Sequence, residues 1–118
     1  MAHPVSILDL SSTMARHAAT RHSLISQNIA NADTPGYKAR DVADFADVMK
    51  AKTLSGSEAS IDPLAVMNRA ALGSPNGNTV SLEEELMRGA KAQQDHEMAV
   101  SLYRSTLTMM KTAVGKNL

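Results

Sequence analysis

Residues 26–38 read SQNIANADTPGYK, and this stretch decides how the chain folds. Asn31 tolerates the left-handed conformation of a helix C-cap, so we expect a helix to end there. Pro35 cannot continue a helix, and it restricts Thr34 to extended geometry. Pro35 and Gly36 suit the two central positions of a type II turn, because glycine accepts a positive φ. The stretch therefore predicts a sharp exit from a helix.

An amphipathic helix is predicted before this exit, over residues 6–32. Its apolar residues recur at intervals of eleven, which is typical of a nearly straight helix. They fall in one narrow stripe when successive residues are turned by about 100°. The stripe consists of Ile7, Met14, Ala18, Ile25, Ile29 and Ala32. We expect this stripe to be buried against another element.

A second and longer helix is predicted over residues 81–115. Ser81 and Glu84 form a capping box at its start, and Gly115 is expected at its C-cap. Its pattern repeats every seven residues, which is the spacing of coiled coils. The two rows contain Leu86, Gln93, Val100, Leu107 and Val114, and Gly89, His96, Tyr103 and Met110. A further apolar face near the end indicates that this helix needs cover on two sides. That face consists of Met98, Leu102, Met109 and Ala113.

The middle of the chain, residues 33–80, has no sustained periodicity. A short helix is predicted over 41–49, and Asp62 followed by proline could start another. Residues 53–60 have the composition of a linker, and residues 73–78 that of a turn-rich loop. We therefore predict an all-α chain that forms a single unit. It has two long terminal helices with a coiled-coil-like core and a weakly structured middle segment.

The composition excludes several classes of function. Twelve Lys and Arg balance twelve Asp and Glu, which argues against a protein that works through a basic patch on nucleic acid or a membrane surface. There is no Cys, which excludes disulfides and thiolate metal sites. No apolar run is long enough to span a membrane. The N-terminus lacks the basic and apolar regions of a cleaved signal peptide, so none is expected.

Two clusters of ionisable residues invite a functional interpretation. His96 lies between Asp95 and Glu97, but adjacent residues point in different directions on a helix. A metal site is therefore not expected, and the histidines are expected at solvated or interface positions. Residues 83–85 are all Glu, and the start of a capped helix explains them better than an acidic active site. No nucleophile elbow and no Gly-rich phosphate loop is present. We expect no enzyme activity, catalytic residue, metal or cofactor.

The stretch SQNIANADTPGYKARD, residues 26–41, resembles the N-terminal signature of the axial proteins of the bacterial flagellum. The signature pattern N-x-A-N-x-x-T-x-G-Y/F is matched by Asn28, Ala30, Asn31, Thr34, Gly36 and Tyr37, with Pro35 inside it. Within that group the sequence is most similar to the family of flagellar basal-body rod proteins, and there to the B-type subunits of the proximal rod. Residues 76–116 resemble the C-terminal segment of the same subunits. The matching residues there are Asn78, Val80, Glu83, Glu85 and Met87.

The resemblance implies a structural subunit of the proximal rod, the drive shaft for motility. It implies that the two terminal helices pair in the core of a tube. It also implies a division of the chain into one core helix over 6–32, a variable middle over 33–80 and a second core helix over 81–115. The apolar rows then become the expected assembly core. This core comprises Ile7, Met14, Ala18, Ile25, Ile29, Leu86, Val100, Tyr103, Leu107, Met110 and Val114.

The partners implied by the resemblance are other rod subunits, in homo- and hetero-oligomeric contacts, together with the ring–rod junction protein and the membrane ring. The flagellar type III export apparatus is implied as well. It would deliver the chain to the periplasmic rod of the basal body without a cleaved signal peptide. An alternative from another class is a small helical adaptor, or an export-chaperone-like protein, that binds partner helices in the cytoplasm.

Overall fold

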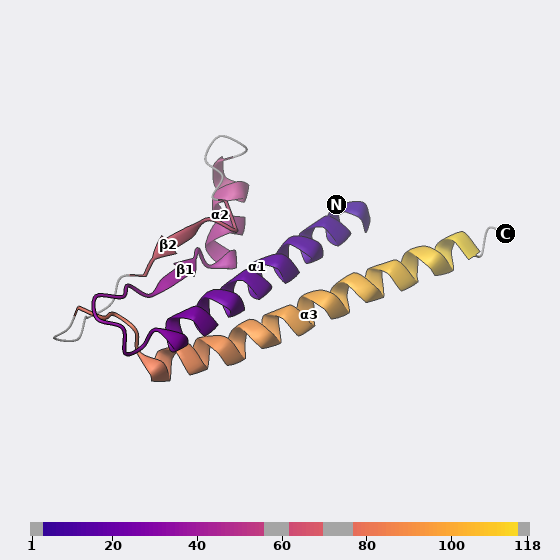
Figure 1. The fold of residues 1–118 in the computed structure, drawn as a ribbon. Coiled ribbons are helices and arrows are strands. Elements are labelled where there is room, and N and C mark those ends of the chain that lie inside the picture. Colours follow the sequence, from indigo (N-terminus) through magenta and orange to yellow (C-terminus); the bar gives the residue numbers. More distant parts are fainter. Residues whose placement is uncertain (1–3, 56–61, 70–76, 116–118) are drawn as a thin grey trace.

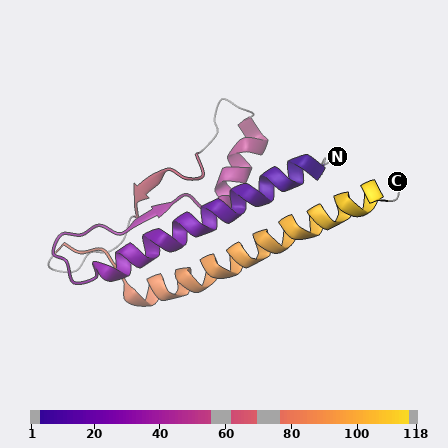
Figure 2. The same cartoon turned by 45° about the vertical axis from the view of Figure 1, so that its right-hand side comes forward.

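The computed structural model describes residues 4–55, 62–69 and 77–115. Its elements in order are α1 (Pro4–Ala30), β1 (Arg40–Val42), α2 (Phe45–Ser55), β2 (Val66–Asn68) and α3 (Leu82–Gly115). Helices α1 and α3 lie side by side and antiparallel, with both termini at one end of a molecule of 66 × 30 × 15 Å (Figure 1, Figure 2). The predicted architecture of two long terminal helices with a weak middle is confirmed, and two short strands are added to it.

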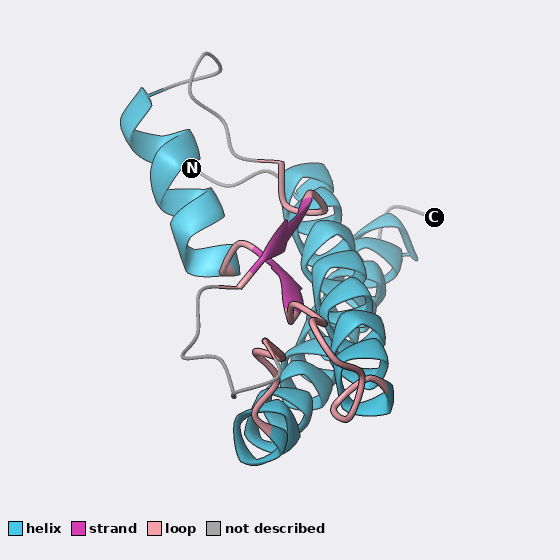
Figure 3. Cartoon of the chain, turned by 60° about the vertical axis from the view of Figure 1, so that its left-hand side comes forward, coloured by secondary structure: helices cyan, strands magenta, loops and turns pink. Residues whose placement is uncertain are grey.

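The strands form an antiparallel ribbon in which Arg40 lies opposite Asn68 and Val42 lies opposite Val66. Strand β1 lies against α1, whereas α2 projects away from the helical hairpin (Figure 3). The ribbon therefore connects the projecting part of the middle to the hairpin.

The two long helices pack through small side chains. The buried row on α3, which we call the seam, consists of Glu85, Ala92, Ala99 and Thr106. The predicted spacing of seven is present, but the seam lies one residue before the row that starts at Leu86, which is 65% exposed. Gly89 also faces α1, because a Cβ built there lies 3.6 Å from Ile25 Cγ2. Alanine and glycine allow a close approach of the helices, and the larger apolar side chains are displaced from the line of contact.

The predicted stripe on α1 is only partly buried. Ala18 and Ile25 are buried, whereas Ile7, Met14 and Ile29 are half-buried. The stripe missed other buried side chains of α1, namely Ser11, His17, Leu24 and Asn28. Three of these four residues are polar and capable of hydrogen bonding, and apolar periodicity does not reveal such residues.

The exit from α1 follows the prediction with one correction. Gly36 has a φ of 76°, and the Tyr37 N–H donates to Thr34 O at 3.2 Å across the turn. Asn31 does not adopt a positive φ, so the expected left-handed cap is wrong. Instead the Asn31 side chain donates from Nδ2 to Gln27 O at 2.8 Å. This bond satisfies a carbonyl at the helix end without an unusual backbone conformation.

The predicted short helices of the middle need correction. The helix expected over 41–49 starts only at Phe45, because the preceding residues belong to β1. The helix expected after Asp62 is a turn in which its carboxylate accepts from Leu64 N–H at 2.9 Å, and the chain continues into β2. Pairing of β1 with β2 replaces helix at both places. The linker expected over 53–60 overlaps the end of α2, and its remainder lies outside the described residues, as does most of the loop expected over 73–78.

Candidate functional site

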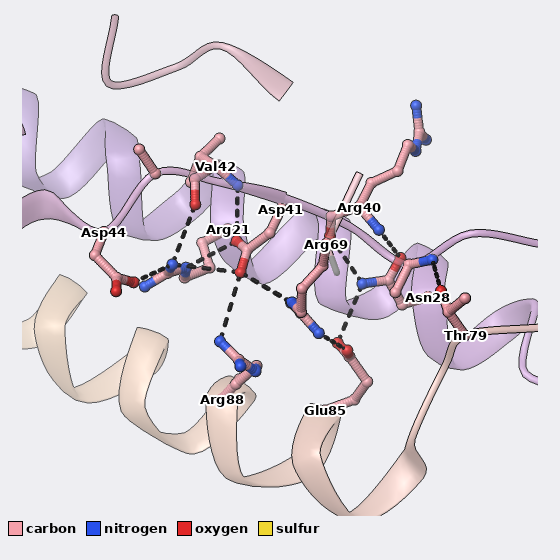
Figure 4. Close-up of polar contacts among 12 residues, drawn as sticks. Arg21, Asn28, Arg40, Asp41, Val42, Asp44, Arg69, Thr79, Glu85 and Arg88 are labelled. Atoms are coloured by element: carbon pink, nitrogen blue, oxygen red, sulfur yellow. Dashed lines mark hydrogen bonds and ion pairs between the residues drawn. The ribbon is translucent and has the colours of Figure 1, made fainter. Parts of the chain in front are cut away.

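Asn28, the first residue of the signature, is fully buried and joins three parts of the fold. Its Nδ2 donates to Arg40 O at 2.9 Å, and its Oδ1 accepts from Arg40 N–H at 3.0 Å. The same side chain donates to Glu85 Oε2 at 3.2 Å and accepts from the Tyr37 hydroxyl at 3.2 Å. Figure 4 shows Asn28 between β1 and α3. This one amide therefore fixes α1, the strand and α3 relative to one another.

The rest of the signature is held by the segment that leads into α3. Asn78 Nδ2 donates to the backbone carbonyls of Asn31 and Thr34, at 2.9 and 2.7 Å. The Thr79 N–H donates to Tyr37 O at 3.0 Å. The other signature residues, Ala30 and Pro35, are exposed. The two stretches on which the resemblance rests, far apart in sequence, thus form one structure in space.

Six charged side chains form a cluster beside Asn28, which we call the ion cluster. Its members are Arg21, Asp41, Asp44, Arg69, Glu85 and Arg88. Asp41 is at the centre: Arg21 Nε and Arg69 Nη2 each lie 2.9 Å from its carboxylate, and Arg88 Nη1 lies 3.6 Å away. The three cations balance the three anions. The ion cluster connects α1, both ends of the ribbon and α3, as Figure 4 shows.

The sequence predicted none of the ion pairs of this cluster, and it placed Glu85 at a helix start. The Glu85 side chain is 0% exposed and pairs with Arg69, whereas Glu83 and Glu84 are exposed as a helix start requires. The capping role is correct for this helix, since Ser81 Oγ accepts from Glu84 N–H at 3.5 Å. The sequence did contain a signal for Glu85, because it precedes Ala92 and Ala99 at intervals of seven.

The ion cluster shifts the titration of its acids. Burial by itself raises the pKa of Asp41, but hydrogen bonds from Arg21, from Val42 N–H and from Arg69 outweigh it, and the pKa of this carboxyl lies below its ordinary value. The hydrogen bond from Arg21 likewise lowers the pKa of Asp44. Both groups are therefore charged under neutral conditions, which the bonding of the ion cluster requires.

His17 does not fit the expectation of solvated or interface histidines. It is buried, and its Nε2 lies 2.6 Å from Ala43 O. Since a carbonyl can only accept, Nε2 carries the proton and donates it. The ring also meets Phe45 edge to face, with centroids 5.3 Å apart. His17 therefore secures the start of α2 on α1, while His22 and His96 are exposed.

The polar contacts of Asn28, Asn78 and the ion cluster position chain segments relative to one another. Within residues 4–55, 62–69 and 77–115, no group of three His, Asp or Glu side chains is arranged to hold a metal ion. In the same ranges, no helix has the length and apolar character needed to cross a bilayer. The charges of the ion cluster are used to neutralise one another and to bond backbone groups.

The expected assembly core on α3 is only partly covered in the single chain. Leu86 and Val114 are exposed, at 65% and 62%, and Tyr103 is exposed as well. Val100, Leu107 and Met110 are half-buried. These side chains lie beside the seam, so each keeps part of its surface accessible, and Leu86 and Val114 keep most of theirs.

Comparison with known proteins gives the class to which this hairpin and its signature belong. Residues 11–38, which cover most of α1 and the exit turn, match the family model described as "Flagella basal body rod protein". The signature is thus similar to that of flagellar rod proteins.

Curated relatives agree with that class and narrow it. The flagellar basal body rod protein FlgB of Agrobacterium fabrum is 29% identical over 96% of each chain. FlgB of Salmonella typhimurium is 31% identical over 84% of this chain and 86% of its own length. FlgB of Escherichia coli is 31% identical over 70% of this chain and 74% of its own. The chain belongs to the FlgB family of flagellar basal body rod proteins, which is a structural and non-enzymatic family.

Proposed function

We propose that this chain is a structural subunit of the flagellar basal-body rod and that the α1–α3 hairpin is the element through which it assembles. The observation that carries the proposal is the exposure of large apolar side chains along α3, outside the seam. The most exposed of them are Leu86, Met87, Met98, Met109 and Val114. Solvent-exposed apolar surface of this extent on one helix is typical of a surface that a neighbouring chain covers.

The proposed mechanism is mechanical. Each subunit contributes a stiff helical pair whose internal contact is the seam, and neighbouring subunits cover the remaining apolar side of α3. Torque then passes through interdigitated helices without turnover of a substrate. The chain acts as one unit in this role, with residues 33–80 as the variable part between two core helices.

We further propose a place and a set of neighbours for the subunit. It lies in the proximal, periplasmic part of the rod, reached through the flagellar type III export apparatus without a cleaved signal peptide. Its neighbours are other rod subunits, the ring–rod junction protein and the membrane ring. Family membership supports this placement, and secretion in strains with and without the export apparatus tests it.

Charge substitutions on α3 test the assembly surface. Leu86→Asp places a charge on a side chain exposed in the free chain, so the hairpin should unfold at the same urea concentration as the parent. Its incorporation into basal bodies should fall at least tenfold, because burial of an unpaired charge at a contact is unfavourable. Leu107→Asp should also abolish assembly and swimming, although Leu107 is half-buried and its hairpin should be less stable.

The matched control is Gln94→Asp, an exposed polar position of the same helix. It should assemble and swim like the parent. Quantitative mass spectrometry of purified basal bodies measures incorporation. Full incorporation of Leu86→Asp contradicts the assembly surface. Absence of the parental chain from basal bodies, with a discrete dimer in the cytoplasm, contradicts the rod role and favours the helical adaptor.

A further inference from the structure

The two edges of the ribbon differ in how their backbone groups are satisfied. Residues of an antiparallel pair alternate between those that bond across the pair and those whose N–H and C=O point outward. The Arg69 N–H donates to Ala39 O at 2.7 Å, which together with the register sets this alternation. Arg40 and Val42 therefore point their backbone groups outward from β1, and Val66 and Asn68 point theirs outward from β2.

The outer edge of β1 is closed by side chains. Asn28 donates to and accepts from the backbone of Arg40, as a neighbouring strand would. The Val42 N–H donates to Asp41 Oδ1 at 2.7 Å, and Val42 O accepts from Arg21 Nη2 at 3.2 Å. All four outward groups of β1 thus have partners. No further strand can add on this side, because α1 occupies it.

The outer edge of β2 is open. Among the described residues, none bonds to the outward backbone groups of Val66 or Asn68. The side chains of this segment are exposed and apolar: Val66 and Met67 are each 48% exposed, and Leu64 is 40% exposed. An unpaired strand edge with exposed apolar side chains is the template on which an added strand forms.

Apart from the short length of β2, this open edge lacks the devices that usually protect such an edge. Proteins protect free edges with lysines, with proline or a bulge in the strand, or with inward-pointing charges. Residues 64–68 read LAVMN and contain no charge and no proline, and the register of β2 with β1 is regular. We therefore expect the outer edge of β2 to pair with another strand in the assembled protein.

We propose that β2 takes up an extended segment of a neighbouring rod subunit as a third strand. The inference rests on the proposed rod function. The added segment offers alternating backbone N–H and C=O groups that bond the open edge of β2. It also carries apolar side chains that contact Val66 and Met67. It is a different surface of the neighbour and not a second β2, because pairing of two β2 edges requires a two-fold axis. Successive subunits of a helical tube are instead related by a rotation with a translation, and such contacts join two different surfaces of the subunit.

A proline substitution tests the strand pairing directly. Val66→Pro removes one outward N–H and leaves the bonds between β1 and β2 in place, since a proline at the outer side of an edge strand is tolerated. The free chain should keep its helical circular dichroism and its unfolding midpoint. Its incorporation into basal bodies should fall at least tenfold, and swimming should be lost.

Two matched variants make the result specific. Val66→Thr keeps a β-branched side chain and the N–H, and it should assemble like the parent. Met67→Pro removes an N–H that bonds to β1, so it should already perturb the ribbon in the free chain. Normal incorporation and swimming of Val66→Pro overturn the strand proposal and leave the rod function intact. Absence of the parental chain from basal bodies overturns both.

Amide hydrogen exchange of the parental chain gives an answer that does not depend on the folding of any variant. In the free chain the amides of Val66 and Asn68 should exchange fast, while that of Arg69, which is bonded to Ala39 O, should be protected. In isolated basal bodies the amides of Val66 and Asn68 should become at least a hundredfold slower. Unchanged exchange there overturns the proposal. Protection that develops in the free chain as its concentration rises, as a dimer forms, shows self-pairing and overturns the choice of occupant.

Discussion

At the scale of single residues, the polar side chains of the hairpin matter more than its apolar ones. Asn28 bonds the strand on one side and Glu85 on the other, and Asp41 receives three arginines. A buried amide or carboxylate is costly unless its hydrogen bonds are made, so each of these side chains admits few arrangements of its neighbours. The signature motif therefore encodes a geometry of chain segments as well as a helix end.

Asn28→Ala should destabilise the free chain by about 3 kcal/mol, because it leaves the Arg40 backbone groups without a partner and removes one hydrogen bond from the buried Glu85 carboxylate. Asn31→Ala removes hydrogen bonds near the surface and should cost about 1 kcal/mol or less. Urea unfolding followed by circular dichroism measures both. Equal losses for the two variants would contradict the role given to Asn28.

The stability of the chain should fall in acid through Asp41 and Asp44. Their pKa values are lower in the folded chain than the ordinary value of 3.8. Such groups contribute stability that is present in full above about pH 5 and is lost as the pH falls below the ordinary value and through the folded pKa. Urea unfolding between pH 7 and pH 3 should show this loss. The Asp41→Asn variant should have a lower free energy of unfolding than the parent at pH 7, and this free energy should fall less between pH 7 and pH 3. If it falls as steeply as in the parent, other groups cause the acid sensitivity.

At the scale of elements, the contact between α1 and α3 depends on small side chains. Ala92 and Ala99 are at most 1% exposed, and Gly89 faces Ile25. Close approach of helix backbones at such residues leaves no room for a longer side chain. The seam therefore fixes the distance between the helices, and the large apolar side chains of α3 remain for other contacts.

Two substitutions in the contact between α1 and α3 should change the stability of the chain in opposite directions. Gly89→Ala should stabilise the chain by about 0.5–1 kcal/mol, because alanine has the better helix propensity and its Cβ meets Ile25 at an ordinary distance of 3.6 Å. Ala99→Leu should destabilise it by about 1–3 kcal/mol through overpacking. Thermal unfolding of both variants measures the difference. Stabilisation by Ala99→Leu would mean that the helices are less closely packed than the seam indicates.

At the scale of the whole molecule, the hairpin is uneven in length. Ile25 lies against Gly89, and Asn28 bonds Glu85. If this antiparallel register is continued to the start of α1, Pro4 lies opposite Met110. The last turn of α3 thus extends beyond the described start of α1, and Val114 is 62% exposed. All five residues of this end, 111–115, are exposed.

Amide hydrogen exchange should differ between the end of α3 and the part of α3 that lies against α1. In the free chain the amides of residues 111–115 should exchange fastest within α3, because local opening is easiest where tertiary contacts are few. The amides of residues 88–100, opposite the middle of α1, should be the slowest. In basal bodies the difference should shrink as neighbouring subunits cover the end of α3. Uniform exchange along α3 in the free chain would contradict this gradient.

The sequence by itself determined the two long helices, the turn at Gly36 and the family. Seven-residue and eleven-residue patterns, a capping box and a proline–glycine pair are local signals, and they depend on residues a few positions apart. It also predicted the weak middle, which lacks such signals. These features follow from the chain's own short-range stereochemistry, so no knowledge of distant contacts is needed.

Only the tertiary structure decided which side of α3 is buried, which groups Asn28 bonds and how the middle segment attaches to the hairpin. The seam at Ala92 and Ala99 is chosen by the closeness of α1, a distance that apolar periodicity does not contain. Glu85 was read as part of a helix start because its partner Arg69 lies 16 residues away. Strand β1 replaces predicted helix because Arg21 and Asn28 satisfy its outer edge from α1. Each decision depends on hydrogen bonds or packing between segments remote in sequence, and these exist only once the chain has folded.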